Sequence, residues 1–578
     1  MDKALLLVES SDASTAGRLE KTLAVFGVDS QRLTVAEFKG AVGIAGSNSK
    51  HRLLGPATAF LRWAEVLAEN PRVRLDWQKN VHSVMVFGEN DPASFERLAR
   101  QTTGDTSASL NKANPGTDWT VTGELPEFCQ SMSGIRVAVN EDGSTGLTCD
   151  GSKAATSRII NGPNGAALVR SELYGVPVFL ATAGVIDVDA PLSGRVFDVR
   201  THFLSAVPLA MYAKWAFAEI CWQPPETCAC LVIDDPLLKP RYGYLKYQQL
   251  LDLMERVNFS TSIAFIPWNW RRSSKKIIRL FRENPGRLSL SIHGCDHTGG
   301  EFGSRNNGRL AWKSKQAMHR MAGHQTRTGL PHDPVMVFPQ GVFSEASMAV
   351  LKRGKFIGVV NSEVISTDPV PRAIKIGDYW NVAVMNYSDF PIFTRRYPWA
   401  GVENFAFDIL LGKPCIVVVH HNDCHDDCRH VVECMERLNK LNVQLRWTNL
   451  AEVVHRSFRQ RKISPDVMEV EMFGNEVRLE NHSSAEKTFR CRKQESDASA
   501  IKDIRIATGV VQWSTADNYI SFEVKLGPGE AKTVTINYTE PADAGFAGEN
   551  LKYRVKAMVR RYLCEFRDNY VMRKSFSQ

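Results

Sequence analysis

The most constraining feature of this 578-residue sequence is a regular alternation of apolar strands and helical segments between residues 226 and 460. Helical patterns such as residues 246–258 and 344–354 separate six apolar runs that are typical of buried strands. Each intervening helix carries the chain back to the same edge of the sheet, so the strands lie parallel. The sequence therefore predicts a parallel (β/α) barrel with fewer than the usual eight strands. The predicted strands are residues 230–234, 260–267, 288–294, 335–341, 356–361 and 415–421.

Polar side chains gather at the carboxyl ends of four of these strands. In a parallel barrel these ends share one rim, and the active site of such a fold forms there. Scattered polar residues would be the chance expectation, so their placement predicts one catalytic mouth. The residues concerned are Asp234, Asp235, His293, Asp296, His297, Gln340, His420, His421 and Asp423.

Asp234 and Asp235 are adjacent carboxylates at the end of a buried strand, where they repel each other and are poorly solvated. A nearby positive charge is therefore expected. The spacing of His293 and His297 places both imidazoles on one face of a helical turn, where they can share one ion. Two imidazoles and one carboxylate with an open position suit zinc and also accept cobalt or nickel. The sequence thus predicts one bound divalent transition metal, with zinc as the preferred ion, and a reaction that hydrolyses an amide or ester.

Residues 226–430 resemble the polysaccharide deacetylase superfamily of the carbohydrate esterase family 4 type. The resemblance rests on the Asp-Asp of "VIDDP", the H-x-x-x-H of "HGCDH" and the late strand "VVVHH". It implies a distorted (β/α) barrel that removes N-acetyl groups from a sugar or polysaccharide in a metal-dependent reaction. It also implies these roles: Asp234 as general base, Asp235, His293 and His297 as metal ligands, and His420 as general acid.

The sequence departs from the family pattern at three places. Pro236 stands where the first motif has glycine, and no arginine precedes Pro339 in the third motif. Residues 359–364 hold no counterpart of the fourth motif, so a divergent member with different residues orienting Asp234 and His420 is predicted. Three further residues near the mouth are predicted to bind substrate: Gln340, His421 and Asp423.

Two other classes of function stay open. One is a non-catalytic glycan-binding or assembly protein that retains the barrel. The other is a metal-free glycosidase that pairs Asp234 with a second carboxylate, Asp296 or Glu301. Metal content and acetate release distinguish these classes from a deacetylase.

The flanking segments predict further domains. Residues 1–205 alternate strands and helices as in an open, flavodoxin-like α/β sheet, and they contain no nucleotide-binding motif. A scaffolding role, or the binding of a protein partner, is expected for them. Residues 206–225 are predicted as a connecting helix and linker. Residues 461–578 alternate apolar and polar positions, which predicts an antiparallel β-sandwich followed by a carboxyl-terminal helix over 549–573.

The net charge of +8 is small for this length, and basic residues are scattered, for example at 271–276 and 559–562. We interpret them as solvated surface, with an anionic glycan or membrane surface as the alternative, and expect no nucleic-acid partner. The amino terminus lacks the pattern of a signal peptide, and no apolar stretch is long enough to span a membrane. Twelve cysteines in so long a chain fit reduced thiols. A cytoplasmic location is therefore predicted.

Overall fold

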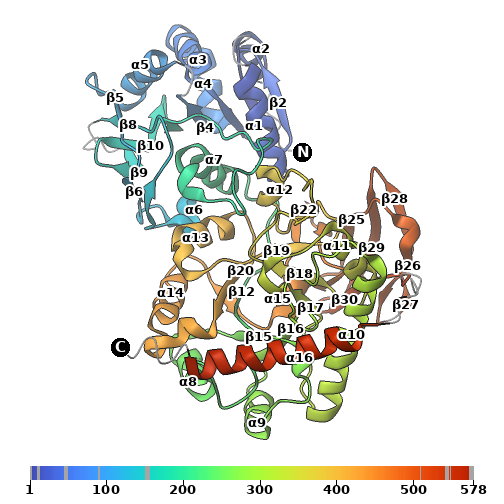
Figure 1. Cartoon of the computed structure of the whole chain (residues 1–578). Helices are drawn as coiled ribbons and strands as arrows, with labels where there is room; N and C mark the ends of the chain where they lie inside the picture. Colours follow the sequence, from blue (N-terminus) through green and yellow to red (C-terminus); the bar gives the residue numbers. More distant parts are fainter. Residues whose placement is uncertain are drawn as a thin grey trace.

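The computed structural model describes residues 3–9, 13–43, 50–88, 91–149, 156–507, 509–540, 546 and 548–571. These residues form a mixed α/β molecule with several sheets. Figure 1 shows the sheets coloured in the order in which they occur along the chain. An 11-stranded sheet comes first, a curled parallel sheet occupies the middle, and two smaller sheets follow.

Half of the first sheet is parallel, in the strand order β2-β1-β3-β4-β11. This order corresponds to the flavodoxin-like arrangement expected from the sequence. Buried apolar residues such as Leu6, Leu54 and Met85 form the interior of this half. The bounds are β1 (Ala4–Leu7), β2 (Ser30–Leu33), β3 (His51–Pro56), β4 (Val81–Phe87), β11 (Val176–Ala181), α1 (Ala13–Val25), α2 (Val35–Ala41), α3 (Ala57–Glu69), α4 (Pro71–Asn80) and α5 (Pro92–Thr103).

The other half of this sheet is antiparallel, which differs from the open α/β sheet predicted for residues 1–205. At the far edge of the sheet, for example, β7 pairs antiparallel with β6. The alternation of exposed and buried residues in β7 is the pattern of a strand covered on one face only. This half comprises β5 (Ser109–Lys112), β6 (Thr117–Val121), β7 (Arg136–Val139), β8 (Thr145–Thr148), β9 (Ser157–Gly162) and β10 (Gly165–Leu173), with α6 (Pro126–Cys129).

Helix α7 (Phe203–Ala216) connects the first sheet to the barrel and is buried on nearly all sides. Its residues are apolar around the whole helix, and its one lysine, Lys214, donates to the Trp222 carbonyl oxygen at 2.6 Å. The Tyr212 hydroxyl lies 3.0 Å from the Ser83 hydroxyl in the first sheet. The helix is apolar on all sides because it is buried between the first sheet and the barrel.

The middle sheet contains seven parallel strands in the order β19-β18-β17-β16-β15-β12-β20, and β21 also pairs with β12. The sheet curls until its two ends meet. Arg396, just beyond β19, forms a parallel bridge to Val417 of β20, with backbone hydrogen bonds of 3.0 and 2.9 Å. The bounds are β12 (Thr227–Asp234), β15 (Thr261–Phe265), β16 (Leu288–His293), β17 (Val335–Val337), β18 (Gly358–Asn361), β19 (Ile392–Thr394), β20 (Cys415–His420) and β21 (Leu445–Trp447).

Helices surround the curled sheet, and local signals in the sequence explain where several of them begin and end. Ser274 and Asn306 cap the amino ends of α9 and α10 by accepting hydrogen bonds from the backbone. Asn258 and Gly329 end α8 and α10 in left-handed conformations. The helices are α8 (Tyr247–Val257), α9 (Lys275–Glu283), α10 (Asn307–Thr328), α11 (Glu345–Arg353), α12 (Ile376–Trp380), α13 (Val402–Leu410), α14 (Arg429–Asn439) and α15 (Leu450–Arg456).

Two sheets follow the barrel, and their inward side chains share one apolar cluster that includes Val470, Phe489, Ile504 and Val534. The antiparallel prediction is wrong for one pair, because β23 runs parallel to β25. One sheet contains β22 (Arg459–Ser464), β23 (Val467–Met472), β25 (Lys487–Gln494), β28 (Trp513–Ala516) and β29 (Tyr519–Leu526). The other contains β24 (Glu476–Glu480), β26 (Ile501–Ile506), β27 (Gly509–Val510) and β30 (Ala531–Tyr538).

The last helix, α16 (Leu551–Phe566), returns from these sheets and crosses the barrel (Figure 1). The hydroxyl of Tyr553 lies 2.7 Å from that of Thr298 in the loop after β16, and Glu565 pairs with Lys239 and Arg272. The predicted residues 572 and 573 lie outside the described part of the chain. Among the described residues, no helix has the length and apolar character needed to cross a membrane.

Candidate active site

Asp234 and Asp235 lie at the carboxyl end of β12, which pairs with β15 and β20 in the curled sheet. In register, Asp234 faces His420 of β20 on one side and Ala264 of β15 on the other. Asp235 follows with φ of +78°, a left-handed conformation that aspartate tolerates better than most residues. The change of backbone direction separates the two carboxylates, and each has its own set of partners.

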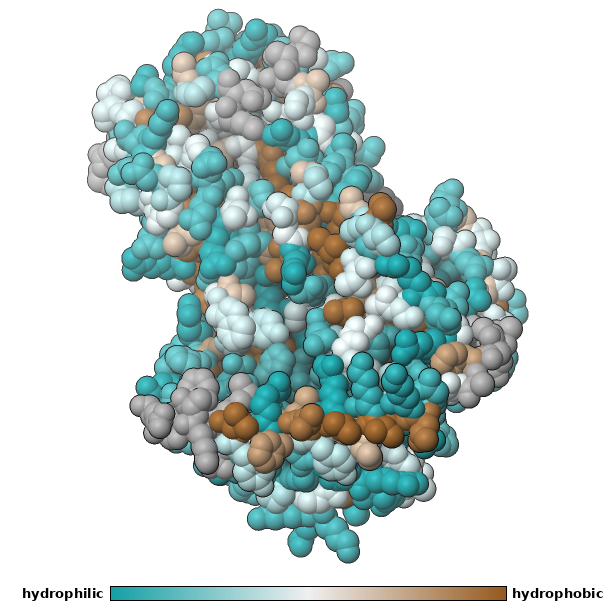
Figure 2. Space-filling view, viewed as in Figure 1, coloured by the Kyte–Doolittle hydropathy of each residue, from teal (hydrophilic) through white to brown (hydrophobic). Residues whose placement is uncertain are grey.

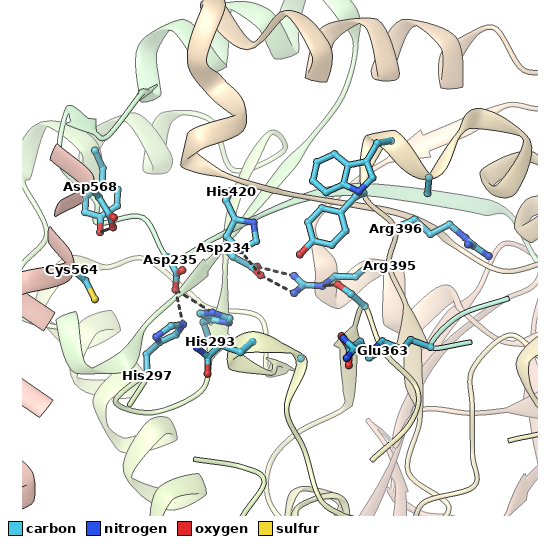
Figure 3. A pocket seen from close by; sticks show the side chains of 18 of the residues that line it. Asp234, Asp235, His293, His297, Glu363, Arg395, Arg396, His420, Cys564 and Asp568 are labelled. Atoms are coloured by element: carbon cyan, nitrogen blue, oxygen red, sulfur yellow. Dashed lines mark hydrogen bonds and ion pairs between the residues drawn. The ribbon is translucent and has the colours of Figure 1, made fainter. Parts of the chain in front are cut away.

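Asp235 faces His293 and His297, as Figure 3 shows. Its Oδ1 lies 3.2 Å from Nε2 of His293 and 2.9 Å from Nε2 of His297. Within the described residues, these three form the one group whose potential ligand atoms lie close enough, within 4.8 Å of one another, to hold a metal ion. The three side chains selected from the sequence therefore meet in space.

A strand end and a loop bring the two histidines together, and the helical turn expected from their spacing is wrong. His293 ends β16, and His297 has φ of +55° in the loop beyond it. The Glu301 carboxylate accepts hydrogen bonds from the backbone amides of Cys295, Asp296 and His297 at 2.8–3.1 Å. Three charge-assisted hydrogen bonds to one carboxylate hold the loop in its turn.

The donor set suits a divalent transition metal. Nδ1 of His293 lies 3.0 Å from the Val337 carbonyl oxygen, an acceptor, so Nδ1 carries the proton and the Nε2 lone pair faces Asp235. Asp235 Oδ1 is buried, and no described residue donates a hydrogen bond of good geometry to it. A buried carboxylate oxygen between two imidazole nitrogens fits a shared cation.

The charges in this cluster shift the pKa values of Asp235 and His293 so that the ionised form of each is favoured. Burial raises the pKa of Asp235, but the imidazoles of His297 and His293 outweigh burial and hold that pKa well below its ordinary value. Burial lowers the pKa of His293, yet the carboxylates of Asp234 and Asp235 leave it above its ordinary value. The site therefore attracts positive charge.

Asp234 forms a bidentate ion pair with Arg395, with both Nη to Oδ distances at 2.7 Å (Figure 3). Both side chains are buried. Burial raises the pKa of Asp234, but the Arg395 guanidinium outweighs it, so the pKa lies below its ordinary value. The sequence indicated no arginine to orient Asp234, because none precedes Pro339. Arg395 pairs with Asp234 from the position directly after β19, a three-residue strand that the sequence pattern did not reveal.

His420 ends β20 beside Asp234, and its Nε2 lies 4.0 Å from Asp234 Oδ2. Its side chain is 39% exposed, so it can reach a bound molecule. The ring of Tyr397 stacks at a centroid distance of 6.1 Å on His420 and at 4.4 Å on Trp399. Sequence reasoning missed both aromatic residues, which follow Arg395 and Arg396 in "TRRYPW".

These residues line one pocket of about 490 Å³ that also includes Gln340, one of the predicted substrate-binding residues. Helix α16 and the turn after it form one wall with Arg560, Arg561, Cys564, Arg567 and Asp568. Arg561 is 8% exposed, and its Nη2 lies 3.4 Å from Nδ1 of His297. The pocket is thus built from the barrel rim together with the distant carboxyl-terminal helix.

Four other candidate residues do not line this pocket. His421 is buried with its Nε2 3.4 Å from Asp568 Oδ2, and the Asp423 carboxylate accepts a 2.8 Å hydrogen bond from the His420 backbone amide. Asp296 pairs with Lys313 and Arg320. Glu301 holds the loop described above. Substrate binding by His421 and Asp423 therefore has no support from the pocket geometry, and neither does a glycosidase pair that uses Asp296 or Glu301.

No protein-family model and no curated protein matches the chain. Among solved structures, the Xyl-CE4 domain of a multidomain xylanase from the hindgut metagenome of Trinervitermes trinervoides is 11% identical, with a TM-score of 0.24 over 39% of this chain and 89% of that one. A family 4 carbohydrate esterase from Streptomyces lividans in complex with acetate is 10% identical, with a TM-score of 0.22 over 37% and 86%. A glutamine amidotransferase from Methylobacillus flagellatus is 10% identical, with a TM-score of 0.20 over 37% and 90%. These values describe a distant similarity of fold.

Proposed function

We propose that this protein is a metal-dependent hydrolase that removes N-acetyl groups from a sugar or polysaccharide. The observation that carries the proposal is the meeting of Asp235, His293 and His297 beside Asp234 in one pocket. These groups come from the ends of two strands and one loop, and a purely structural role requires no such convergence.

Asp235, His293 and His297 would hold the metal, with zinc as the first choice and cobalt or nickel as alternatives. A divalent metal bound there would supply the Lewis acidity that activates water and polarises the amide carbonyl. The hydrogen bond from Nδ1 of His293 to the Val337 carbonyl oxygen would leave Nε2 free to hold the metal.

Asp234 and His420 would move the protons. Asp234 is a carboxylate near neutral pH because its pKa is lowered, and it would accept a proton from the attacking water. Arg395 would position Asp234 through its two hydrogen bonds. His420 Nε2 would donate a proton to the amine nitrogen as the carbon–nitrogen bond breaks, so that acetate and a free amine leave.

The pocket also suits a sugar. Trp399 is 66% exposed and stacks on Tyr397, so its face forms an aromatic wall beside His420. Sugar rings have an apolar face that packs on such surfaces, while polar groups fix their orientation. Gln340 is exposed in the same pocket and would hydrogen-bond the substrate.

Acetate release from N-acetylated chitooligosaccharides tests this function. We expect release by the wild type, and a loss of at least about 100-fold in kcat for Asp234→Asn with metal content unchanged. Asp368→Asn is the matched control, because Asp368 pairs with Arg305 outside the pocket and should retain activity. Near-normal release by Asp234→Asn would refute the role of Asp234. Binding of the oligosaccharides without acetate release would favour a non-catalytic glycan-binding protein.

A further inference from the structure

The outer face of α16 carries a continuous row of exposed apolar side chains, which Figure 2 shows as a brown stripe along the helix. The spacing repeats every three or four residues, as expected for one face of a helix. The row continues into the short turn Arg567–Val571. Its members are 43–73% exposed: Leu551, Val555, Met558, Val559, Tyr562, Leu563, Phe566, Tyr570 and Val571.

This row differs from ordinary exposed apolar residues. Of the fourteen large apolar side chains exposed in the described part of the chain, nine lie between residues 551 and 571. The other five, such as Leu75 and Val370, lie singly in distant segments. Single exposed apolar residues need no explanation, but a contiguous row indicates an interaction surface.

Basic residues flank the row, whereas the one acidic residue of the helix is paired with the barrel. Lys552, Arg554 and Lys556 are exposed, and no ion pair joins them to another described residue. Glu565 instead pairs with Lys239 and Arg272, beneath the helix. At 100° per residue, Arg554 lies along one edge of the row and Lys556 along the other, while Lys552 lies within the row near its amino-terminal end. The surface therefore combines an apolar centre with positive borders.

We propose that α16 docks in the surface plane of a membrane that contains anionic phospholipid. An apolar face with basic borders is the pattern of an interfacial helix, whose apolar side chains enter the boundary between headgroups and acyl chains. Positive borders at that depth face lipid phosphates. A second copy of the chain fits less well, because pairing two such faces would bring unpaired basic borders together.

Docking leaves the pocket wall intact. Arg560 and Arg561 of the same helix line the pocket on the side opposite the apolar row. The proposal therefore does not depend on the proposed deacetylase activity, and outer-face variants should retain activity on a soluble substrate.

Co-sedimentation of the full chain with vesicles tests the docking. We expect binding to equimolar phosphatidylcholine and phosphatidylglycerol, weaker binding at high salt, and little binding to phosphatidylcholine alone. Leu563→Gln with Phe566→Gln should weaken binding to the anionic vesicles at least about tenfold, because two large apolar side chains are lost from the row. Leu75→Gln is the matched control, because Leu75 is an exposed leucine on helix α4 and its replacement should leave binding unchanged.

If circular dichroism shows that the apolar variant is misfolded, a second variant that changes only charge tests the proposal instead. Lys552→Gln with Lys556→Gln changes exposed side chains only and should reduce both binding and its salt dependence several-fold. Equal binding of the wild type and both variants would overturn the proposal. A wild-type dimer that the apolar variant converts to monomer, with no vesicle binding, would assign the row to a second copy and also overturn it.

Discussion

Asp234 and Arg395 form a buried ion pair, so replacing the arginine should lower both the stability of the fold and the proposed activity. Arg395→Gln leaves the Asp234 carboxylate buried without a counter-charge, so we expect the free energy of unfolding to fall by about 3–5 kcal/mol. Arg395→Lys retains the charge but loses the bidentate geometry, so stability should fall less while kcat falls strongly. Urea unfolding and acetate release measure the two effects.

Arg195→Gln is the control for these variants. Arg195 pairs with Glu363 at the rim of the same pocket, and its side chain is 76% exposed. Exposed pairs contribute little to stability, so this change should leave the unfolding curve nearly unchanged. A loss of stability for Arg195→Gln equal to that for Arg395→Gln would show that burial does not set the cost.

Asp235 and His293 could be selected from sequence because each lies at the end of a recognisable apolar strand, and His297 because it follows His293 by four residues. Arg395 could not, because it lies 161 residues from Asp234 and follows a strand of only three residues. The signal was present as two arginines directly after "PIFT". Recognising it requires knowing that β19 takes part in closing the sheet, which is a property of the whole barrel.

Among the structural elements, the loop after β16 determines where His297 lies. Gly294 has φ of +61°, and a Cβ there would lie 2.3 Å from Glu301 Oε1 and 2.5 Å from Pro339 Cγ. Gly294→Ala should therefore displace Glu301 from the loop amides and lower the free energy of unfolding by at least about 2 kcal/mol. Thermal unfolding and metal content measure the result.

Gly286→Ala provides the comparison within the turn before the same strand, because nothing lies within 4 Å of the added Cβ. We expect it to match the wild type. If Gly294→Ala also matched the wild type, Glu301 would not control the position of His297.

This loop also shows the limit of arguing from residue spacing. The four-residue interval between His293 and His297 indicated a shared ion, and the two side chains do meet at Asp235. The helical turn predicted to bring them together is absent, since His297 is left-handed and Glu301 binds the loop. Spacing alone cannot distinguish a helix from a loop held by a buried carboxylate.

At the scale of the whole molecule, His455 forms an ion pair between the barrel and the sheets that follow it. It belongs to α15, and its Nε2 lies 3.1 Å from Glu476 Oε2 in β24. Burial lowers the pKa of His455, but Glu452 and Glu476 outweigh burial and raise it from 6.5 to about 9. The protonated histidine thus stabilises the fold fully below about pH 6.5, and this contribution is lost as pH rises through about 9.

His455→Gln should remove this dependence. We expect the difference in unfolding free energy between wild type and variant to shrink by on the order of 3 kcal/mol between about pH 6 and about pH 10. Denaturant unfolding across this range measures it. A difference that stayed constant with pH would show that His455 does not carry the charge that joins the two parts.

The order of α/β, barrel and β-rich segments could be predicted from periodicity, because each type of sheet has its own pattern of apolar residues. The position of α16 against the barrel could not be predicted in this way. Glu565 of the helix pairs with Lys239, and Asp568 in the turn after it accepts a hydrogen bond from Tyr242, each pair 326 residues apart. Local sequence indicates a helix, but only the assembled barrel provides the surface over which it lies.

Metal content of the purified protein tests the proposed metal site and separates a metal-dependent hydrolase from a metal-free glycosidase. We expect about one divalent transition metal per chain for the wild type and for Asp234→Asn, and much less for Asp235→Ala and His297→Ala, because each of these two loses one of three protein ligands. Elemental analysis after zinc reconstitution measures all four proteins. Stoichiometric metal in His297→Ala, or none in the wild type, would contradict the assignment of Asp235, His293 and His297 as a metal site.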